Sequence, residues 1–200
     1  MTETGRRERK KAATRQALAD AAIELFLERG YDAVGVREIA DAADVSTTTL
    51  FKHFPGGKEA LVFDQDADRE AALVAAVRER PAGQSIPEAL RQLLRDERSQ
   101  QARADPRFAD FLRLIETTPV LREHVRRMAL RHETVLTAAI AADSGLPDDD
   151  PACQALAHFA LEAVTLVHGR ADPEPALDRI FALLDNGWAG TRTAHPTSGR

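Results

Sequence analysis

The sequence predicts an all-α protein, and three observations lead to that prediction. The chain has no run of alternating β-branched residues, it has only one Tyr and one Trp, and its apolar residues recur every three or four positions over long stretches. Alternation and aromatic enrichment are typical of strands, whereas a spacing of three or four is typical of amphipathic helices. We therefore expect about nine helices.

The first expected helix covers about residues 11–29. Its apolar residues share one face: Leu18, Ala21, Ala22, Leu25 and Phe26. Gly30 follows directly, at the position where a glycine in the left-handed conformation commonly ends a helix.

Two short helices follow the first one. The second is expected over about residues 36–43, with Gly35 at its N-cap position, where glycine offers no side-chain acceptor. Asp44 then enters the left-handed region, which aspartate tolerates. Ser46 begins the third helix, which ends near His53 and is too short to be stable without tertiary packing.

The rest of the chain is expected to be helical between Gly- and Pro-containing loops. The remaining expected helices cover about residues 58–80, 86–103, 107–116, 120–143, 151–168 and 175–188. Residues 190–200 are rich in Thr and Gly, include Pro and His, and show no apolar periodicity, so we expect a disordered tail there. We place two domains before the tail, over residues 10–66 and 67–189.

The composition predicts a cytoplasmic protein. Hydrophobic residues make up 44% and charged residues 30% of the chain, which is ordinary for a globular protein. No apolar run approaches the roughly 20 residues of a membrane span, and residues 1–11 lack the apolar core of a signal peptide. The single cysteine, Cys153, cannot form an internal disulfide, and no CxxC pair suggests structural zinc.

Charge is distributed unevenly along the chain, whose net charge is −5. Residues 1–58 hold ten of the 27 Lys and Arg and nine of the 32 Asp and Glu, so all the excess acid is C-terminal. The first fifteen residues form a dense basic arm with only Glu3 and Glu8 as acids; its cations are Arg6, Arg7, Arg9, Lys10, Lys11 and Arg15. Such an arm suits nucleic acid, although a solvated, frayed terminus has the same composition.

The second and third expected helices form a helix-turn-helix supported by the first. This motif lays its second helix in the major groove of DNA. Thr47, Thr48 and Lys52 lie on the outer face of that helix, where hydroxyl, methyl and ammonium groups can contact base edges. Side chains at the helix ends and in the arm are expected to contact phosphates: Ser46, His53, Arg9, Lys10 and Lys11. An amphipathic helix pair without any DNA role is the alternative.

Residues 14–61 resemble the DNA-binding domain of TetR-family regulators. The resemblance rests on these residues: Thr14, Ala21-Ala22, Leu25-Phe26, Gly30-Tyr31, Ile39-Ala40, Ala43, Val45-Ser46, Thr49-Leu50, Phe54 and Lys58-Glu59-Ala60-Leu61. By position it implies a phosphate contact for Lys58, whose alternative is an exposed lysine in a Gly-rich turn. Phe51 and Gly35 depart from the family pattern, because a Tyr hydroxyl and a Thr hydroxyl that often meet phosphates are missing.

The resemblance also implies what the helical domain does. Such regulators are dimers that bind palindromic operators, commonly as repressors released by a small molecule. The last two helices would pair with those of a second copy, and both carry broad apolar faces: Leu156, Phe159, Ala160, Ala163, Val164 and Val167, then Ile180, Phe181, Leu183, Leu184 and Trp188. A purely intramolecular core is the alternative.

The resemblance further implies a pocket for a small hydrophobic or amphipathic effector inside the helical domain. Candidate lining residues are Phe63, Phe108, Phe111, Leu112, Ile115, Met128, His132, Phe159 and Glu162. Each is also an ordinary core residue by type. His124, His132 and His158 have no partner fixed by spacing that would indicate a metal.

Two other functions are compatible with a helical scaffold. One is a regulator of the same fold controlled by a protein partner instead of a small molecule. The other is an enzyme, but we find no nucleophile motif, and the Gly56-Gly57-Lys58 turn lacks the surroundings of a phosphate-binding loop. We therefore expect a DNA-binding regulator without enzymatic activity and without a cofactor.

Overall fold

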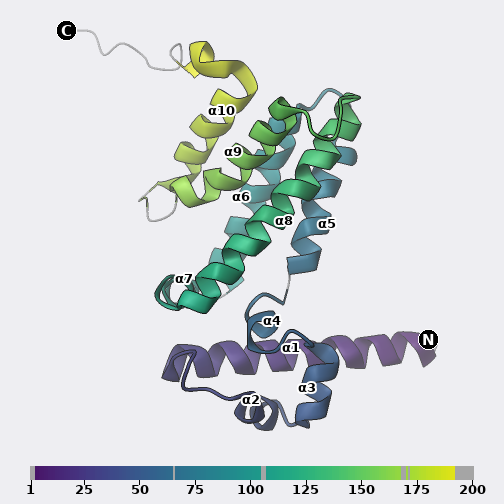
Figure 1. Ribbon diagram of the computed structural model, residues 1–200, viewed down its shortest axis with the longest axis vertical. Helices are drawn as coiled ribbons and strands as arrows, with labels where there is room; N and C mark the ends of the chain where they lie inside the picture. The colour runs from purple at the N-terminus through teal and green to yellow at the C-terminus, as the bar shows by residue number, and fades with distance from the viewer. Residues whose placement is uncertain (1–2, 65, 105–106, 168–169, 171, 192–200) are drawn as a thin grey trace. The chain divides into compact units, whose positions relative to one another are not determined.

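The computed structural model describes residues 3–64, 66–104, 107–167, 170 and 172–191, and every regular element in them is a helix (Figure 1). The all-α fold predicted from the sequence is confirmed. Ten helices are present in these residues: α1 (Glu3–Arg29), α2 (Val36–Ala42), α3 (Thr47–His53), α4 (Lys58–Val62), α5 (Asp66–Arg78), α6 (Ile86–Ala104), α7 (Phe108–Thr117), α8 (Pro119–Ser144), α9 (Pro151–Val167) and α10 (Pro173–Thr191). The expected tail begins within α10, and its residues 192–200 lie outside the described part.

The chain forms two compact units, which we describe separately. The first contains residues 1–66 and 106–126, and the second contains residues 67–105 and 127–200. The expected division of the chain at residue 66 agrees with the end of the first segment, but residues 106–126 also belong to the first unit. Leu121 of α8, in that second segment, is buried in the core of the first unit.

The core of the first unit explains why its short helices are stable. Leu18, Ala22 and Phe26 of α1 are fully buried together with Ile39 of α2 and Leu50 of α3. Helices of seven residues are marginal alone, so the apolar face of each must be covered by α1.

The helix ends of the first unit agree with the sequence. Gly30 has φ 84° and Asp44 has φ 53°, so both adopt the left-handed conformation expected of them. Gly35 is the N-cap of α2 without a side-chain hydrogen bond. Ser46 is the N-cap of α3, where its Oγ accepts a hydrogen bond from the amide of Thr49 at 3.1 Å.

The prediction of a single helix over residues 58–80 was wrong. The structure ends α4 at Val62, with Phe63 at its C-cap (φ −113°, ψ 45°), and begins α5 at Asp66. The ring of Phe63 stacks on that of His124 at 4.8 Å between centroids. This contact joins residues far apart in sequence, which is why the apolar spacing did not reveal the break.

The second unit is a helical bundle around one apolar core. Small side chains on α9, namely Ala157, Ala160 and Ala163, are buried and let its neighbours approach closely. Phe181 of α10 is only 2% exposed in the same core. Much of the apolar surface of the last two helices is therefore covered within one chain.

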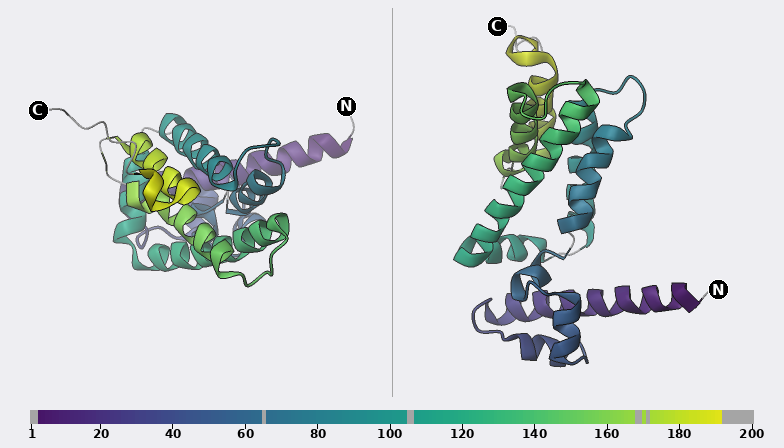
Figure 2. Two further views of the ribbon diagram at one scale, coloured as in Figure 1. Left: turned by 90° about the horizontal axis from the view of Figure 1, so that it is seen from above. Right: turned by 45° about the vertical axis from the view of Figure 1, so that its right-hand side comes forward.

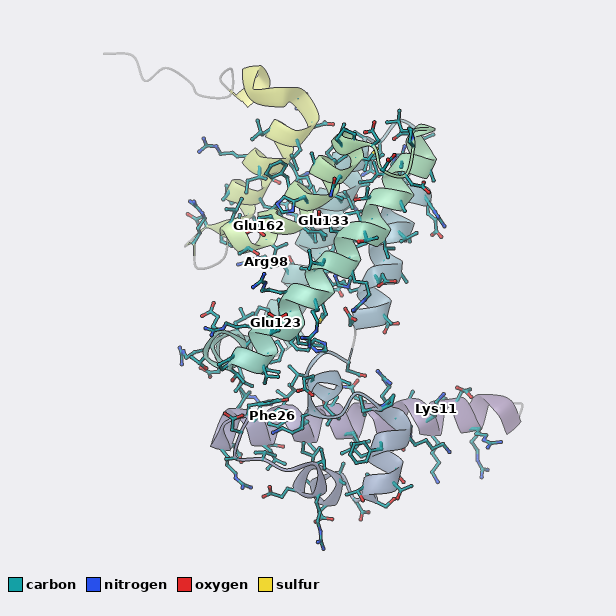
Figure 3. The ribbon with its side chains drawn as sticks, viewed as in Figure 1. Lys11, Phe26, Arg98, Glu123, Glu133 and Glu162 are labelled. Atoms are coloured by element: carbon teal, nitrogen blue, oxygen red, sulfur yellow. The ribbon has the colours of Figure 1, made fainter. Side chains whose placement is uncertain are left out.

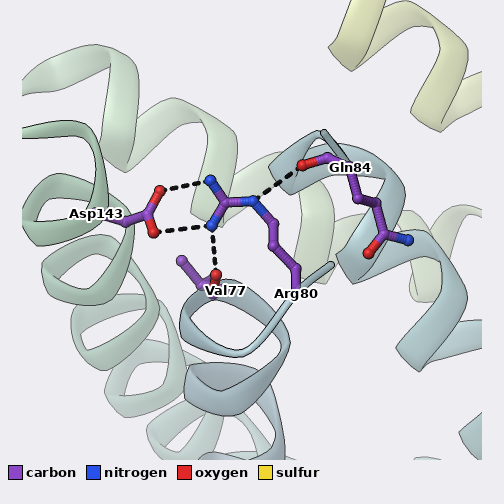
Figure 4. A network of polar contacts seen from close by, with 4 residues as sticks. All are labelled: Val77, Arg80, Gln84 and Asp143. Atoms are coloured by element: carbon purple, nitrogen blue, oxygen red, sulfur yellow. Dashed lines mark hydrogen bonds and ion pairs between the residues drawn. The ribbon is translucent and has the colours of Figure 1, made fainter. Parts of the chain in front are cut away.

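Ion pairs link α5 and α8 along their length in the second unit, and the two helices run in the same general direction (Figure 2). Arg131 contacts Glu70 at 3.3 Å near the start of α5. Beyond its end, Arg80 donates two hydrogen bonds to Asp143, at 2.8 and 2.7 Å, and also donates to the carbonyl of Val77 (Figure 4). The Arg80 guanidinium thus binds Asp143 in a bidentate pair and also satisfies the Val77 carbonyl in the last turn of α5.

None of the helices that the structure describes is both long enough and apolar enough to span a lipid bilayer.

Candidate nucleic-acid interface

The outer face of α3 is free of intramolecular packing. Leu50 and Phe54 anchor the helix inward, whereas Thr48 and Lys52 are exposed and Thr47 is half-buried. Phe51 lies on the same outward side and is 48% exposed, although aromatic rings are usually covered. The face therefore presents a hydroxyl, an ammonium and an aromatic ring, which suit base edges and the methyl group of thymine.

The helix before it, α2, is held by a carboxylate where Gly35 supplies no cap. Glu38 accepts a hydrogen bond from the amide of Gly35 at 2.9 Å and pairs with Arg29 at 2.8 Å. The Gly35 hydrogen bond, and then the one from Arg29, lower the pKa of Glu38. The loss of a hydroxyl at residue 35 is thus compensated for the stability of α2, although Gly35 still supplies no side-chain donor for a phosphate.

A groove of about 790 Å³ lies between the N-terminal turns of α1 and the end of α3. Its lining is mostly basic: Arg7, Glu8, Lys10, Lys11, Thr14, Lys52 and His53. Figure 3 shows Lys11 on the part of α1 toward the N-terminus, well separated from Phe26, which is buried in the core. Four cations facing one carboxylate make this groove suitable for an anionic polymer.

Only some residues of the basic arm line this groove. Arg7, Lys10, Lys11 and Thr14 are spaced so that they share one face of α1, and all four line the groove. Arg9 is exposed but is not among the lining residues. The sequence-based candidates did not include Arg7 and Thr14, which this helical spacing would have indicated.

The imidazole of His53 lies at the α3 side of the groove among positive charges. Burial lowers the pKa of His53, and the nearby charges of Lys11, Arg15 and Lys52 lower it further. At neutral pH the ring is therefore uncharged in the free protein. A phosphate in the groove would offset these charges and favour the imidazolium form.

Arg15 belongs to the basic arm by sequence but not by structure. Its Nε contacts Asp64 Oδ1 at 2.5 Å, and its Nη1 donates a hydrogen bond to the carbonyl of His53 at 3.0 Å. The guanidinium also lies 4.5 Å from the centre of the Phe54 ring. These contacts direct its charge into the first unit.

Lys58 is likewise directed inward. Its Nζ donates a hydrogen bond to the carbonyl of Tyr31 at 2.6 Å and lies 4.0 Å from the centre of the Tyr31 ring. Burial and the carboxylate of Glu59 raise the pKa of Tyr31, so its hydroxyl stays protonated. A phosphate contact by Lys58 stays a prediction, because an ammonium has two further protons to donate.

Five effector-pocket candidates lie in the first unit. Phe63 stacks on His124, and the rings of Phe108 and Phe111 are 6.3 Å apart. Phe111 and Ile115 pack against the core that contains Leu121, and Leu112 is half-buried.

The other four candidates lie in the second unit. Met128 and His132 are buried, as a pocket lining requires. Phe159 is 51% exposed and Glu162 is exposed as well, so neither side chain lies in the interior of the second unit. They share the outward face of α9, whose opposite face holds the buried alanines. This is why apolar type alone did not indicate where Phe159 points.

No group of three or more His, Cys, Asp or Glu among the described residues is arranged to hold a metal ion. His158 instead pairs with Glu133 at 2.9 Å.

Comparison with protein families agrees with this architecture in both parts of the chain. Residues 18–64 match bacterial regulatory proteins of the tetR family. Residues 80–189 match the MftR C-terminal domain, which covers more than half of the chain.

Characterised transcriptional regulators are similar to this chain in sequence. The transcriptional regulator TcmR of Streptomyces glaucescens is 34% identical over 152 residues, which are 73% of this chain and 67% of TcmR. The repressor KstR2 of Rhodococcus jostii is 46% identical over 52 residues, which are 26% of this chain and 25% of KstR2.

Solved structures support the fold. GusR of Salmonella enterica has a TM-score of 0.56 at 21% identity, covering 87% of this chain and 94% of its own. The fatty acid degradation regulator FadR of Bacillus halodurans has a TM-score of 0.52 at 20% identity, covering 85% and 93%. The matched family and the similar proteins are transcriptional regulators, and the chain belongs to the TetR family of DNA-binding transcriptional regulators.

Proposed function

We propose that this chain is a homodimeric repressor that binds a palindromic operator and leaves it when a small hydrophobic or amphipathic effector binds. The observation that carries the DNA part is the basic groove beside the outward face of α3. Cations from two helices, Lys11 of α1 and Lys52 of α3, line one groove that is open to an approaching strand.

The groove suits a phosphate backbone and the adjoining face of α3 suits bases. Phosphate contacts give affinity and orientation, whereas groups that reach base edges give specificity. Arg7, Lys10 and Lys11 would follow one strand, with Arg9 as an additional arm contact. Thr48 and Lys52 would then meet the major groove, and the Phe51 ring would contact a thymine methyl or a deoxyribose.

The salt dependence of DNA binding tests this proposal. An operator is first selected from random DNA, and its dissociation constant is then measured by fluorescence anisotropy over a salt series. Lys11→Ala should flatten the log-log slope by about two, because each lost phosphate contact removes about 0.9 and a dimer has two copies. Arg78→Ala is the matched control, since Arg78 is exposed in the last turn of α5, outside the groove.

Two results would contradict the proposed DNA binding. An unchanged slope for Lys11→Ala would exclude the groove as the phosphate site. Failure to enrich any DNA would exclude the repressor function itself.

The dimer part of the proposal rests on apolar side chains that the chain leaves uncovered. Phe159 and Leu166 of α9 are 51% and 54% exposed and lie seven residues apart, hence on one face of the helix. A second copy placed there would cover these side chains on both copies, and a dimer would have the two recognition helices that two half-sites require. The buried residues of α10, such as Phe181, would contribute to the fold of each copy instead.

The effector part rests on polar groups of the second unit that are at least partly buried. Burial raises the pKa of Glu97, whose carboxylate lies 3.6 Å from Nε of Arg69, beyond hydrogen-bond distance. Within the described residues, that Nε and the Thr137 hydroxyl are buried without a hydrogen-bond partner. Buried polar groups normally have partners, so a ligand with its own polar group would stabilise this interior.

Thermal-shift screening of hydrophobic and amphipathic metabolites tests the effector. A ligand that binds the folded protein raises its apparent stability, and the repressor's effector must also release the operator in anisotropy. Stabilising compounds that leave the DNA complex intact would contradict control by that class of molecule and would favour control by a protein partner.

A further inference from the structure

We infer that Arg15 is a positioning residue for DNA recognition: it ties the end of the recognition helix α3 to Asp64, which follows α4 in the chain. The inference rests on the proposed operator binding through α3. It concerns a residue that the sequence groups with the phosphate-binding arm.

The guanidinium of Arg15 uses all three of its nitrogens inside the first unit. Nη1 donates to the carbonyl of His53 at 3.0 Å, Nη2 donates to the carbonyl of Asp64 at 3.2 Å, and Nε pairs with the Asp64 carboxylate at 2.5 Å. Its Cζ also lies 4.5 Å from the centre of the Phe54 ring, a distance at which a cation–π contact adds to these bonds. Three of the five N–H donors of this guanidinium are thereby engaged within the first unit.

The end of α3 needs such support. The helix has seven residues, and its first three are threonines, which are poor helix formers. His53 is its last residue, so its carbonyl has no acceptor role within the helix. The positive charge of Arg15 at this C-terminus satisfies that carbonyl and interacts favourably with the helix dipole.

One side chain therefore holds two segments at once. Asp64 lies beyond α4, whereas His53 ends α3, and the turn between them contains Gly57 in the left-handed conformation (φ 72°). A displacement of Asp64 relative to α1 would pull the fork of Arg15 away from His53. Arg15 therefore couples the end of α3 to the position of Asp64, in addition to the anchoring of the helix by Leu50 and Phe54.

This role predicts a result that separates Arg15 from the groove lysines. Arg15→Lys keeps the charge but replaces the planar fork with a single ammonium, which cannot hold His53 and Asp64 together. Its affinity for the selected operator should fall by about tenfold, the scale of one lost base contact, while affinity for random DNA stays the same. The log-log salt slope should stay that of the wild type, because no phosphate contact is lost.

Asp64→Asn supplies a second route to the same conclusion. It leaves Arg15 in place but removes the carboxylate charge, so specific affinity should fall in the same direction. Combined with Arg15→Lys it should add less than its separate effect, because both changes act on one contact. This variant keeps the inference testable if substitutions at Arg15 prevent folding.

The ratio of specific to random-DNA affinity distinguishes positioning from folding. A loss of folded protein would lower both affinities alike, whereas a misplaced α3 lowers only the specific one. The inference is overturned if Arg15→Lys keeps the wild-type ratio, or if Arg15→Ala flattens the salt slope by about two, as a direct phosphate contact would. Absence of operator binding by the wild-type protein would instead overturn the proposed function.

Discussion

The ammonium of Lys58 lies 2.6 Å from the carbonyl oxygen of Tyr31 and 5.5 Å from the centre of the Phe26 ring. It thereby joins the first residue of α4 to the turn that follows α1. That turn begins at Gly30, whose left-handed conformation ends α1. A residue that the family resemblance places at the DNA backbone is, in the structure, also a link within the core of the first unit.

This link predicts the effect of replacing Lys58. Lys58→Met should lower the free energy of unfolding by about 1 to 2 kcal/mol, because a charged hydrogen bond to a carbonyl is lost. Chemical denaturation measures this loss, and Lys52→Met is the control, since Lys52 is exposed on α3. Unchanged stability with a salt slope flattened by about two would contradict the structural role and support a phosphate contact.

The Arg80–Asp143 pair predicts a dependence of stability on pH. The Arg80 hydrogen bonds lower the pKa of Asp143 from its ordinary 3.8. A lowered pKa contributes stability that is present above the unfolded value and is lost as pH falls through the folded value.

Urea titrations from pH 6 down to about pH 3 measure how the free energy of unfolding depends on pH. Asp143→Asn should be less stable than the wild type at pH 6, by about 1 kcal/mol for a partly exposed pair. The difference should shrink below about pH 4. Asp149→Asn, an exposed position in the loop after α8, should show no difference at any pH. A constant deficit for Asp143→Asn across this range would contradict the assignment.

The outward face of α3 predicts a division of roles between bases and phosphates. Thr48→Ala and Lys52→Ala should each cost about 1 to 3 kcal/mol on the operator and relax preference at a few base pairs in both half-sites. Substitution of Lys10 should weaken all DNA sites alike. Selection from random DNA with each variant checks this, and the division fails if Thr48→Ala and Lys52→Ala both recover the wild-type motif.

The exposed row on α9 predicts how the dimer dissociates. Phe159→Asp combined with Leu166→Asp should give folded monomers, because it would bury two charges per copy at an apolar contact. Sedimentation velocity measures the state, and circular dichroism shows that each copy stays helical. Phe181→Asp is the contrasting variant, since Phe181 is buried and its substitution should unfold the second unit. A wild-type monomer at micromolar concentration would contradict the dimer.

The sequence by itself determined the helices and most of their ends. Ser46 caps α3 through Thr49, three residues away, and Asp44 makes the corner with its own backbone conformation. Such features depend on interactions within a few residues, so local composition is sufficient to predict them. The helix-turn-helix, its outward Thr48 and Lys52, and the family followed from the same local signals.

Only the tertiary structure decided where the long charged and aromatic side chains go. Arg15 reaches Asp64, 49 positions away, and Lys58 reaches Tyr31, 27 positions away. Phe159 faces outward whereas Phe181 faces the core, although both lie on amphipathic helices. A long side chain adopts the rotamer whose partners satisfy its charge or cover its apolar surface. Those partners come from segments that only folding brings together.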